Sequence, residues 1–191
     1  SSASGGLQSL RRNFRMRLIL TFALAIVSLG ALAQTSTYLY PSTSLRWNEV
    51  ICHIDGGVVR DGNGWRGEIL YTVDRDRIYA GYSTSTFNLA YTLREGKLHI
   101  GDSHFTDAIT YTLEQGVVYV GNSNFPLDIA YTIRPDVSHP DVINIFKENS
   151  ISPFDIVATL QGDPSHTELF ALLSSAGCLY FSPLAVPYPQ L

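Results

Sequence analysis

A repeat of 20 residues organises the middle of the chain. Three units open with the same tyrosine-threonine pair, at Tyr71, Tyr91 and Tyr111, and a fourth begins at Tyr131. The units align without gaps, and a Gly-x-Ser triplet recurs at Gly81, Gly101 and Gly121. Because every unit shares this pattern, it describes how the units pack and constrains the architecture more than the chemistry.

Weaker copies extend the repeat in both directions. Upstream, segment 46–54 aligns with segment 65–73 at a spacing of 19 residues. Downstream, the spacing grows to 27 because seven residues are inserted around positions 135–140. We therefore expect six units between residues 38 and 160, with the outer units degenerate, as is common at the ends of repeat arrays.

Each unit is predicted to contain a long and a short strand. In the long strand Ile69, Tyr71 and Val73 alternate with Leu70 and Thr72, a period of two that is typical of a strand with one buried face. The larger apolar side chains are expected to face the core. Small residues are expected on the opposite face, at Ala90, Thr110 and Ala130. Short turns with glycine, such as Glu95-Gly96, join the long strand to the short one.

The pattern predicts an all-β fold built from tandem two-stranded repeats of about 20 residues. The first choice is a β-solenoid, in which equivalent tyrosines and threonines of successive units stack. A hairpin-repeat array and a closed ring like a propeller or trefoil are the alternatives. We expect a single β-repeat domain over residues 34–182.

One helix is predicted after the last repeat. Ser165 and Glu168 have the spacing of a capping box, and leucines then recur at helical spacing up to Gly177. We expect this helix, over residues 165–177, to cap the open core and the unpaired edge of the last repeat. The Pro-rich tail, residues 183–191, is expected to run extended.

Residues 1–33 have the features of a leader with a signal peptide. Arginines flank Met16, an apolar run spans residues 18–29, and Ala31-Leu32-Ala33 forms a small-x-small cleavage site. Residues 1–15 are either upstream read-through or an extended basic region. A retained membrane anchor is the weaker alternative, because the apolar run is short for a bilayer span. We expect an exported protein, periplasmic or secreted, that starts near Gln34.

The charge balance argues against nucleic acid as a partner. The whole chain has 17 acidic and 13 basic residues, a net charge of -4. Removing residues 1–33 removes four arginines and no acidic residue, which leaves 9 basic and 17 acidic residues and a net charge of -8. So acidic a chain is not expected to bind a polyanion.

Two cysteines in an exported chain predict one disulfide, between Cys52 and Cys178. In a straight solenoid these residues would lie too far apart to bond, whereas a closed or folded-back array would bring them together. The alternative is that Cys52, which aligns with Tyr71, replaces a core tyrosine and stays reduced.

No catalytic residues, metal ligands or cofactor are predicted. Carboxylates precede the long strand in most units, at Glu49, Glu68, Asp128 and Asp155. Their repetition favours a role in the loops over a pair of catalytic carboxylates. The five histidines lack metal-ligand spacing, and phosphate-binding glycine loops are missing.

The candidate binding residues form an aromatic row on the short strands. If Ile78 and its equivalents face the core, the next residues point the other way. The row consists of Tyr79, His99, Tyr119 and Phe146. Exposed aromatic rows stack on carbohydrates and promote self-association. The alternative is that the row only packs against the small Ala/Thr face of the sheet.

The sequence therefore favours an exported, non-catalytic binding or surface-structural module. Its expected partner is an extracellular glycan or a protein, contacted through the aromatic row. The alternative is a polysaccharide-acting hydrolase or lyase on the same scaffold, which would need two carboxylates about 5–10 Å apart in a groove. The missing catalytic cluster favours the binding module over the enzyme.

Overall fold

The structure, a computed structural model, describes residues 36–177. The predicted signal peptide, Cys178 and the Pro-rich tail lie outside the described residues. The strands in chain order are β1 (Thr37–Pro41), β2 (Cys52–Asp55), β3 (Val58–Asp61), β4 (Ile69–Asp74), β5 (Arg77–Ala80), β6 (Leu89–Arg94), β7 (Lys97–Ile100), β8 (Ile109–Glu114), β9 (Val117–Val120), β10 (Ile129–Pro135), β11 (Val142–Lys147) and β12 (Ile156–Gln161). They are followed by helix α2 (His166–Ser175).

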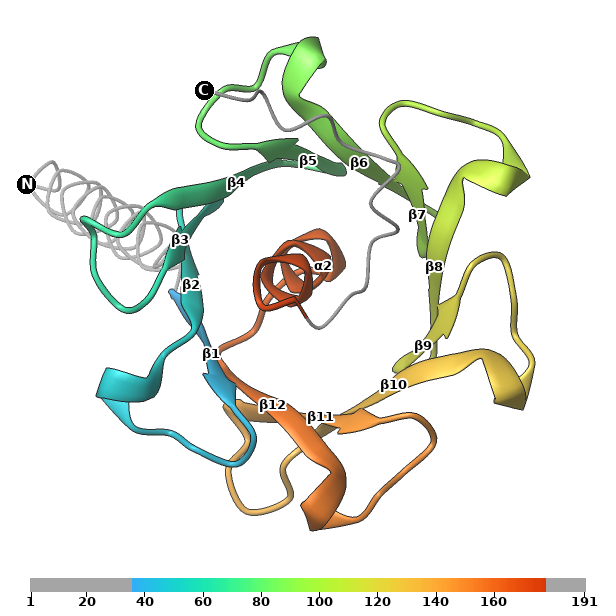
Figure 1. The fold of residues 1–191 in the computed structure, drawn as a ribbon. Helices are drawn as coiled ribbons and strands as arrows, with labels where there is room; N and C mark the ends of the chain where they lie inside the picture. Colours follow the sequence, from blue (N-terminus) through green and yellow to red (C-terminus); the bar gives the residue numbers. More distant parts are fainter. Residues whose placement is uncertain (1–35, 178–191) are drawn as a thin grey trace, which may run out of the picture. The chain divides into compact units, whose positions relative to one another are not determined.

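The described strands form one closed antiparallel barrel of twelve strands (Figure 1). Each strand pairs with its neighbour in sequence, and β1 pairs with β12 as well as β2, as in the pairs Tyr40↔Thr159 and Tyr38↔His53. The prediction of an all-β protein with a C-terminal helix is confirmed. The first choice of a β-solenoid is wrong, and the closed ring that was its alternative is nearer to the structure.

The first and last strands, β1 and β12, together form one repeat unit, and their pairing closes the ring. Five units consist of consecutive long and short strands, and the sixth combines β12 with β1. Closure leaves no sheet edge to cover, which is one way that β proteins avoid aggregation through exposed edges.

Tight hairpin turns explain why the pairs are antiparallel. Glu95 and Gly96, with φ of 50° and 77°, form the turn between β6 and β7. Gln115 and Gly116 repeat this geometry with φ of 50° and 78°. Two successive left-handed residues make the hairpin turn whose twist matches that of the flanking strands, so strand must follow strand in one sheet.

A β-bulge recurs at the start of the long strands β4, β6, β8, β10 and β12. Ile78 pairs with Tyr91 but Tyr79 pairs with Leu89, so Ala90 is the extra residue. Because the bulge interrupts the alternation of side chains, Ala90 belongs to the barrel core and Leu89 does not. The prediction that Ala90 lies on the face opposite the core is therefore wrong.

The predicted helix is present, but it fills the barrel instead of capping a stack. Figure 1 shows α2 inside the ring, where it contacts β2 to β5. Twelve strands spaced about 4.8 Å apart and tilted by about 40° enclose a backbone diameter of about 24 Å. Side chains alone do not fill so wide an interior, and a helix about 10 Å across occupies much of it.

The helix is built for burial on all sides. Its capping box is formed, since Ser165 Oγ accepts from the Glu168 amide at 3.3 Å and Glu168 Oε2 accepts from the Ser165 amide at 2.8 Å. Five consecutive residues, 169–173, are buried in one core with residues of the barrel strands. Ser174 donates to the carbonyl of Phe170 at 2.6 Å, so even its buried hydroxyl is satisfied.

Candidate functional site

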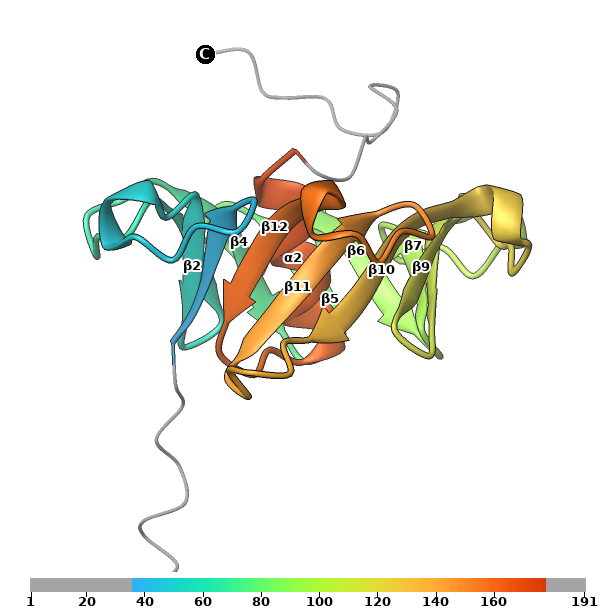
Figure 2. The ribbon, with the colours of Figure 1, turned by 90° about the horizontal axis from the view of Figure 1, so that it is seen from below.

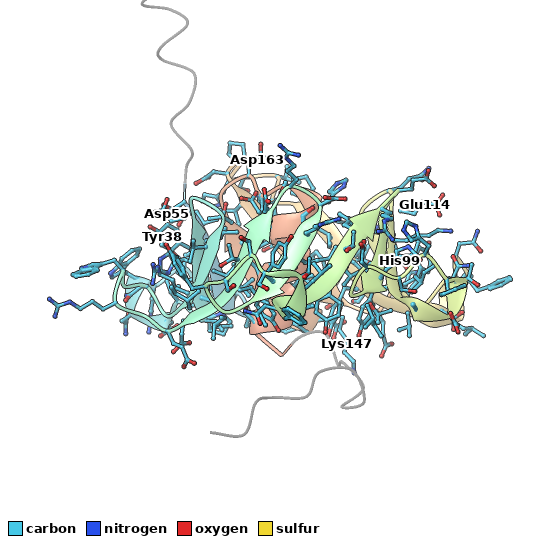
Figure 3. The ribbon with its side chains drawn as sticks, turned by 90° about the horizontal axis from the view of Figure 1, so that it is seen from above. Tyr38, Asp55, His99, Glu114, Lys147 and Asp163 are labelled. Atoms are coloured by element: carbon cyan, nitrogen blue, oxygen red, sulfur yellow. The ribbon has the colours of Figure 1, made fainter. Side chains whose placement is uncertain are left out.

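Six loops project from one end of the barrel. Hairpin turns and outer loops alternate along the chain, so antiparallel pairing places all outer loops at the same end, as Figure 2 shows. Figure 3 shows Asp55, Glu114 and Asp163 toward the hairpin end and Lys147 toward the loop end. The outer loops are residues 42–51, 62–68, 81–88, 101–108, 121–128 and 148–155.

A hydrogen bond that recurs from unit to unit anchors each outer loop to the outside of the barrel. Thr92 Oγ1 donates to the carbonyl of Gly101, the left-handed residue that opens its loop, at 2.7 Å. Four other units have the same bond, in the pairs Thr72–Gly81, Thr112–Gly121, Thr132–Glu148 and Thr159–Ser42. In the remaining unit His53 Nδ1 lies 2.7 Å from the Gly62 carbonyl. The repeated threonine, and His53 in its place, therefore have a loop-anchoring role.

The repeated serine and carboxylate shape the loops. Ser123 Oγ accepts from the Phe125 amide at 3.1 Å and lies 2.5 Å from Asp128 Oδ2, to which it donates. The pairs Ser44–Glu49 and Ser150–Asp155 repeat this contact at 2.5 and 2.6 Å. These carboxylates bind serines of their own loops, which supports the interpretation of the repeated acids as loop residues.

Large apolar side chains are exposed on every outer loop. Phe87, Leu127 and Phe154 occupy the same repeat position and are each 98% exposed. We call the exposed large apolar residues of the outer loops the loop-tip set: Leu45, Trp47, Trp65, Tyr82, Phe87, Phe105, Phe125, Leu127, Ile151 and Phe154. Exposed large apolar side chains that recur on all six loops at one end of the barrel make this end the candidate interaction surface.

The same loops are acidic. They contain seven carboxylates and two basic side chains: Glu49, Glu68, Asp102, Asp107, Asp128, Glu148 and Asp155 against Arg46 and Arg66. The loop end therefore combines apolar tips with negative charge. At the hairpin end, by contrast, the large apolar side chain exposed among the described residues is Val137.

The predicted aromatic row lies on the expected face but is not an exposed surface. Tyr79, His99 and Phe146 are only 3%, 6% and 7% exposed, and Tyr119 is half-buried. They lie outside the barrel core. Each is the cross-strand neighbour of an anchoring threonine, as in the pair Thr72↔Tyr79. The prediction of exposure is wrong for the three buried members, because the outer loops return over this face. The carbonyl of Phe105, for example, accepts a hydrogen bond from His99.

His99 is the polar member of this row. Its Nδ1 is buried and has no hydrogen-bond partner among residues 36–177. Burial, and then the charge of Arg94, lowers the pKa of His99 below its ordinary value of 6.5, while the bond to Phe105 opposes this shift. His104 and Lys97 add smaller contributions in the same direction as Arg94.

We predict that His99→Phe stabilises the protein at acid pH. A lowered folded-state pKa means that His99 contributes stability above pH 6.5 that is lost as the pH falls toward its folded-state pKa. Phe146 shows that phenylalanine fits this repeat position. Thermal unfolding should give a larger gain in Tm over wild type at pH 5.5 than at pH 8. The control His166→Asn, at an exposed histidine that is not among the residues shifting the pKa of His99, should show no such widening. An equal gain at both pH values would contradict the prediction.

The described residues contain no group of three or more histidine, cysteine or acidic side chains placed to hold a metal ion. Cys52 is buried in the core at the place of the repeated tyrosine, and its Sγ lies 3.8 Å from the Leu172 carbonyl. Cys178 lies outside the described residues, so the disulfide stays a prediction. Among residues 36–177 no helix has both the length and the apolar character needed to span a membrane.

Comparisons with known proteins give little guidance. No family model matches the chain, and no curated protein sequence matches it. An X-ray structure of a protein from Arabidopsis thaliana is similar over 73% of this chain and 88% of that chain, with 14% identity and a TM-score of 0.40. At this level of likeness we infer neither fold nor function from it.

Proposed function

We propose that this protein is an exported, non-catalytic binding module that contacts a protein partner through the loop-tip set. The observation that carries the proposal is that every outer loop exposes at least one large apolar side chain. Export is supported by the signal-peptide pattern before Gln34.

The composition of the loop tips favours a protein over a glycan. Sugars stack on aromatic rings, but this set also contains the aliphatic residues Leu45, Leu127 and Ile151. The excess of acidic side chains on the same loops favours a partner surface with apolar pockets and basic neighbours. It opposes self-association through this end, because two copies would bring like charges together.

The enzyme alternative gains no support from the described residues. The carboxylates Glu49, Asp128 and Asp155 each bind a serine of their own loop, and the loops are distributed around the barrel. These contacts explain the repeated carboxylates as loop-forming residues, without a catalytic pair.

A peptide-display selection tests the proposal. The full chain would be compared with the triple variant Phe87→Ser/Leu127→Ser/Phe154→Ser, which removes three fully exposed tips. We expect wild type to enrich peptides that combine apolar and basic residues, with affinity at least ten times that of the variant. Binding should weaken as salt is raised. The free energy of unfolding of the variant should lie within about 0.5 kcal/mol of that of wild type, since the replaced side chains are exposed.

Val137→Ser provides the matched control, because it removes an exposed apolar side chain at the other end of the barrel. It should bind the selected peptides as wild type does. Equal binding by wild type and the triple variant would rule out the loop-tip set as the contact surface.

A further inference from the structure

A small polar groove lies on the outer wall of the barrel beside loop 121–128. Its volume is about 190 Å³. It is lined by Lys97 of β7, by Thr112 and Glu114 of β8, and by Asn122, Ser123 and Asn124 of the loop. Figure 3 shows the position of Glu114 on the barrel wall.

The preceding unit closes the equivalent place with its own side chains. At positions 20 residues earlier, Arg94 replaces Glu114 and Asp102 replaces Asn122. Arg94 Nη2 binds Asp102 Oδ1, and Arg94 Nη1 donates to the Ser103 carbonyl at 2.6 Å. Arg77, at the position of Lys97, lies 3.8 Å from Asp102. In that unit, therefore, both arginines pair with Asp102.

In the open groove the corresponding polar groups are not paired with each other. The two hydroxyls are used by the loop, since Thr112 donates to the Gly121 carbonyl at 2.7 Å and Ser123 binds Asp128 at 2.5 Å. Among the described residues, no side-chain hydrogen bond or ion pair involves the four others: Lys97, Glu114, Asn122 and Asn124. The groove thus presents an ammonium group, a carboxylate and two amides to a ligand.

We infer that this groove binds one neutral sugar ring. The charges of Lys97 and Glu114 offset each other, so neither an anion nor a cation gains a net electrostatic attraction in the groove. Vicinal hydroxyls both donate and accept hydrogen bonds, which matches amides, a carboxylate and an ammonium group together. The volume is below the range of about 300–1,000 Å³ that is usual for drug-sized ligands, which suits a single ring.

The inference goes beyond the proposed function, because the groove uses polar side chains of the barrel wall and not the loop tips. A ligand of about 12 non-hydrogen atoms in a shallow site is expected to bind with a Kd on the order of millimolar. Failure of sugar binding would leave the loop-tip proposal standing, and the triple loop-tip variant contains no residue of the groove.

The test is an NMR titration of the full chain, read from the side-chain amide signals of asparagine. The probes are a neutral hexose, an N-acetylhexosamine, inorganic phosphate and glycine. Each is added up to a concentration of about ten times the expected millimolar Kd. We expect the two sugars to shift the signals of Asn122 and Asn124 in a saturable way. Phosphate and glycine should leave these signals unchanged. Preferential binding of phosphate or glycine would overturn the sugar assignment.

The double variant Glu114→Arg/Asn122→Asp rebuilds the closed arrangement of Arg94 and Asp102. It should fold like wild type, because the neighbouring unit already tolerates that pair, and should bind the sugars at least ten times more weakly. If it does not fold, Asn122→Ala, which alters an exposed loop residue, should give a measurable loss of sugar binding instead. Undiminished binding in the folded variants, or no binding by wild type, would overturn the inference.

Discussion

Replacing Phe170 by alanine is expected to lower the free energy of unfolding by about 3–5 kcal/mol. The ring is fully buried in α2 and packs in the barrel core. A closed sheet has a circumference set by its strand pairing, so the barrel has little freedom to collapse onto the space that the ring leaves. Urea unfolding of the full chain, followed by circular dichroism, measures the loss.

Phe154→Ala is the matched control for this prediction. The chemical change is the same, but Phe154 is 98% exposed at the tip of loop 148–155. The free energy of unfolding should change by no more than about 0.5 kcal/mol. If both variants lost similar stability, α2 would not be the core of the barrel.

The repeat predicted local structure well. The alternation around Tyr71 and the glycine in the turn at Gly96 correspond to a strand and a hairpin, and Ser165 with Glu168 forms the predicted capping box. These features depend on residues only a few positions apart. Ring closure depends on the pairing of β1 with β12, whose residues Tyr40 and Thr159 are separated by most of the repeat region. A constant period is compatible with stacked and closed arrays, so it left both open.

The position of the helix had a sequence signal that the repeat-based interpretation missed. Treating Leu169, Leu172 and Leu173 as one apolar face implied an amphipathic helix on a surface. Residues 169–173, however, are five consecutive apolar residues, including Phe170 on the other side. A helix that is apolar all round is typical of complete burial.

The binding surface was only partly accessible to sequence reasoning. Alternation correctly placed Tyr79 on the face opposite Ile78, but it carries no information about a loop that returns over that face. A usable signal was present in the loops. Phe87, Leu127 and Phe154 share one repeat position between polar and turn-forming residues, where burial in a strand or helix was not expected.

Tyr79→Ala decides whether the aromatic row is packing or a binding surface. Because Tyr79 is 3% exposed, we expect the free energy of unfolding to fall by about 3 kcal/mol or more, as for other buried aromatic residues. Tyr82→Ala, three residues later and 74% exposed, should cost about 0.5 kcal/mol or less. Urea unfolding of both variants gives these values, and the peptides selected with wild type give a second measurement.

Tyr82→Ala should weaken peptide binding with little loss of stability, since Tyr82 belongs to the loop-tip set. If Tyr79→Ala instead kept its stability and lost peptide binding, the row would be the contact surface, and the loops would have to move away from it.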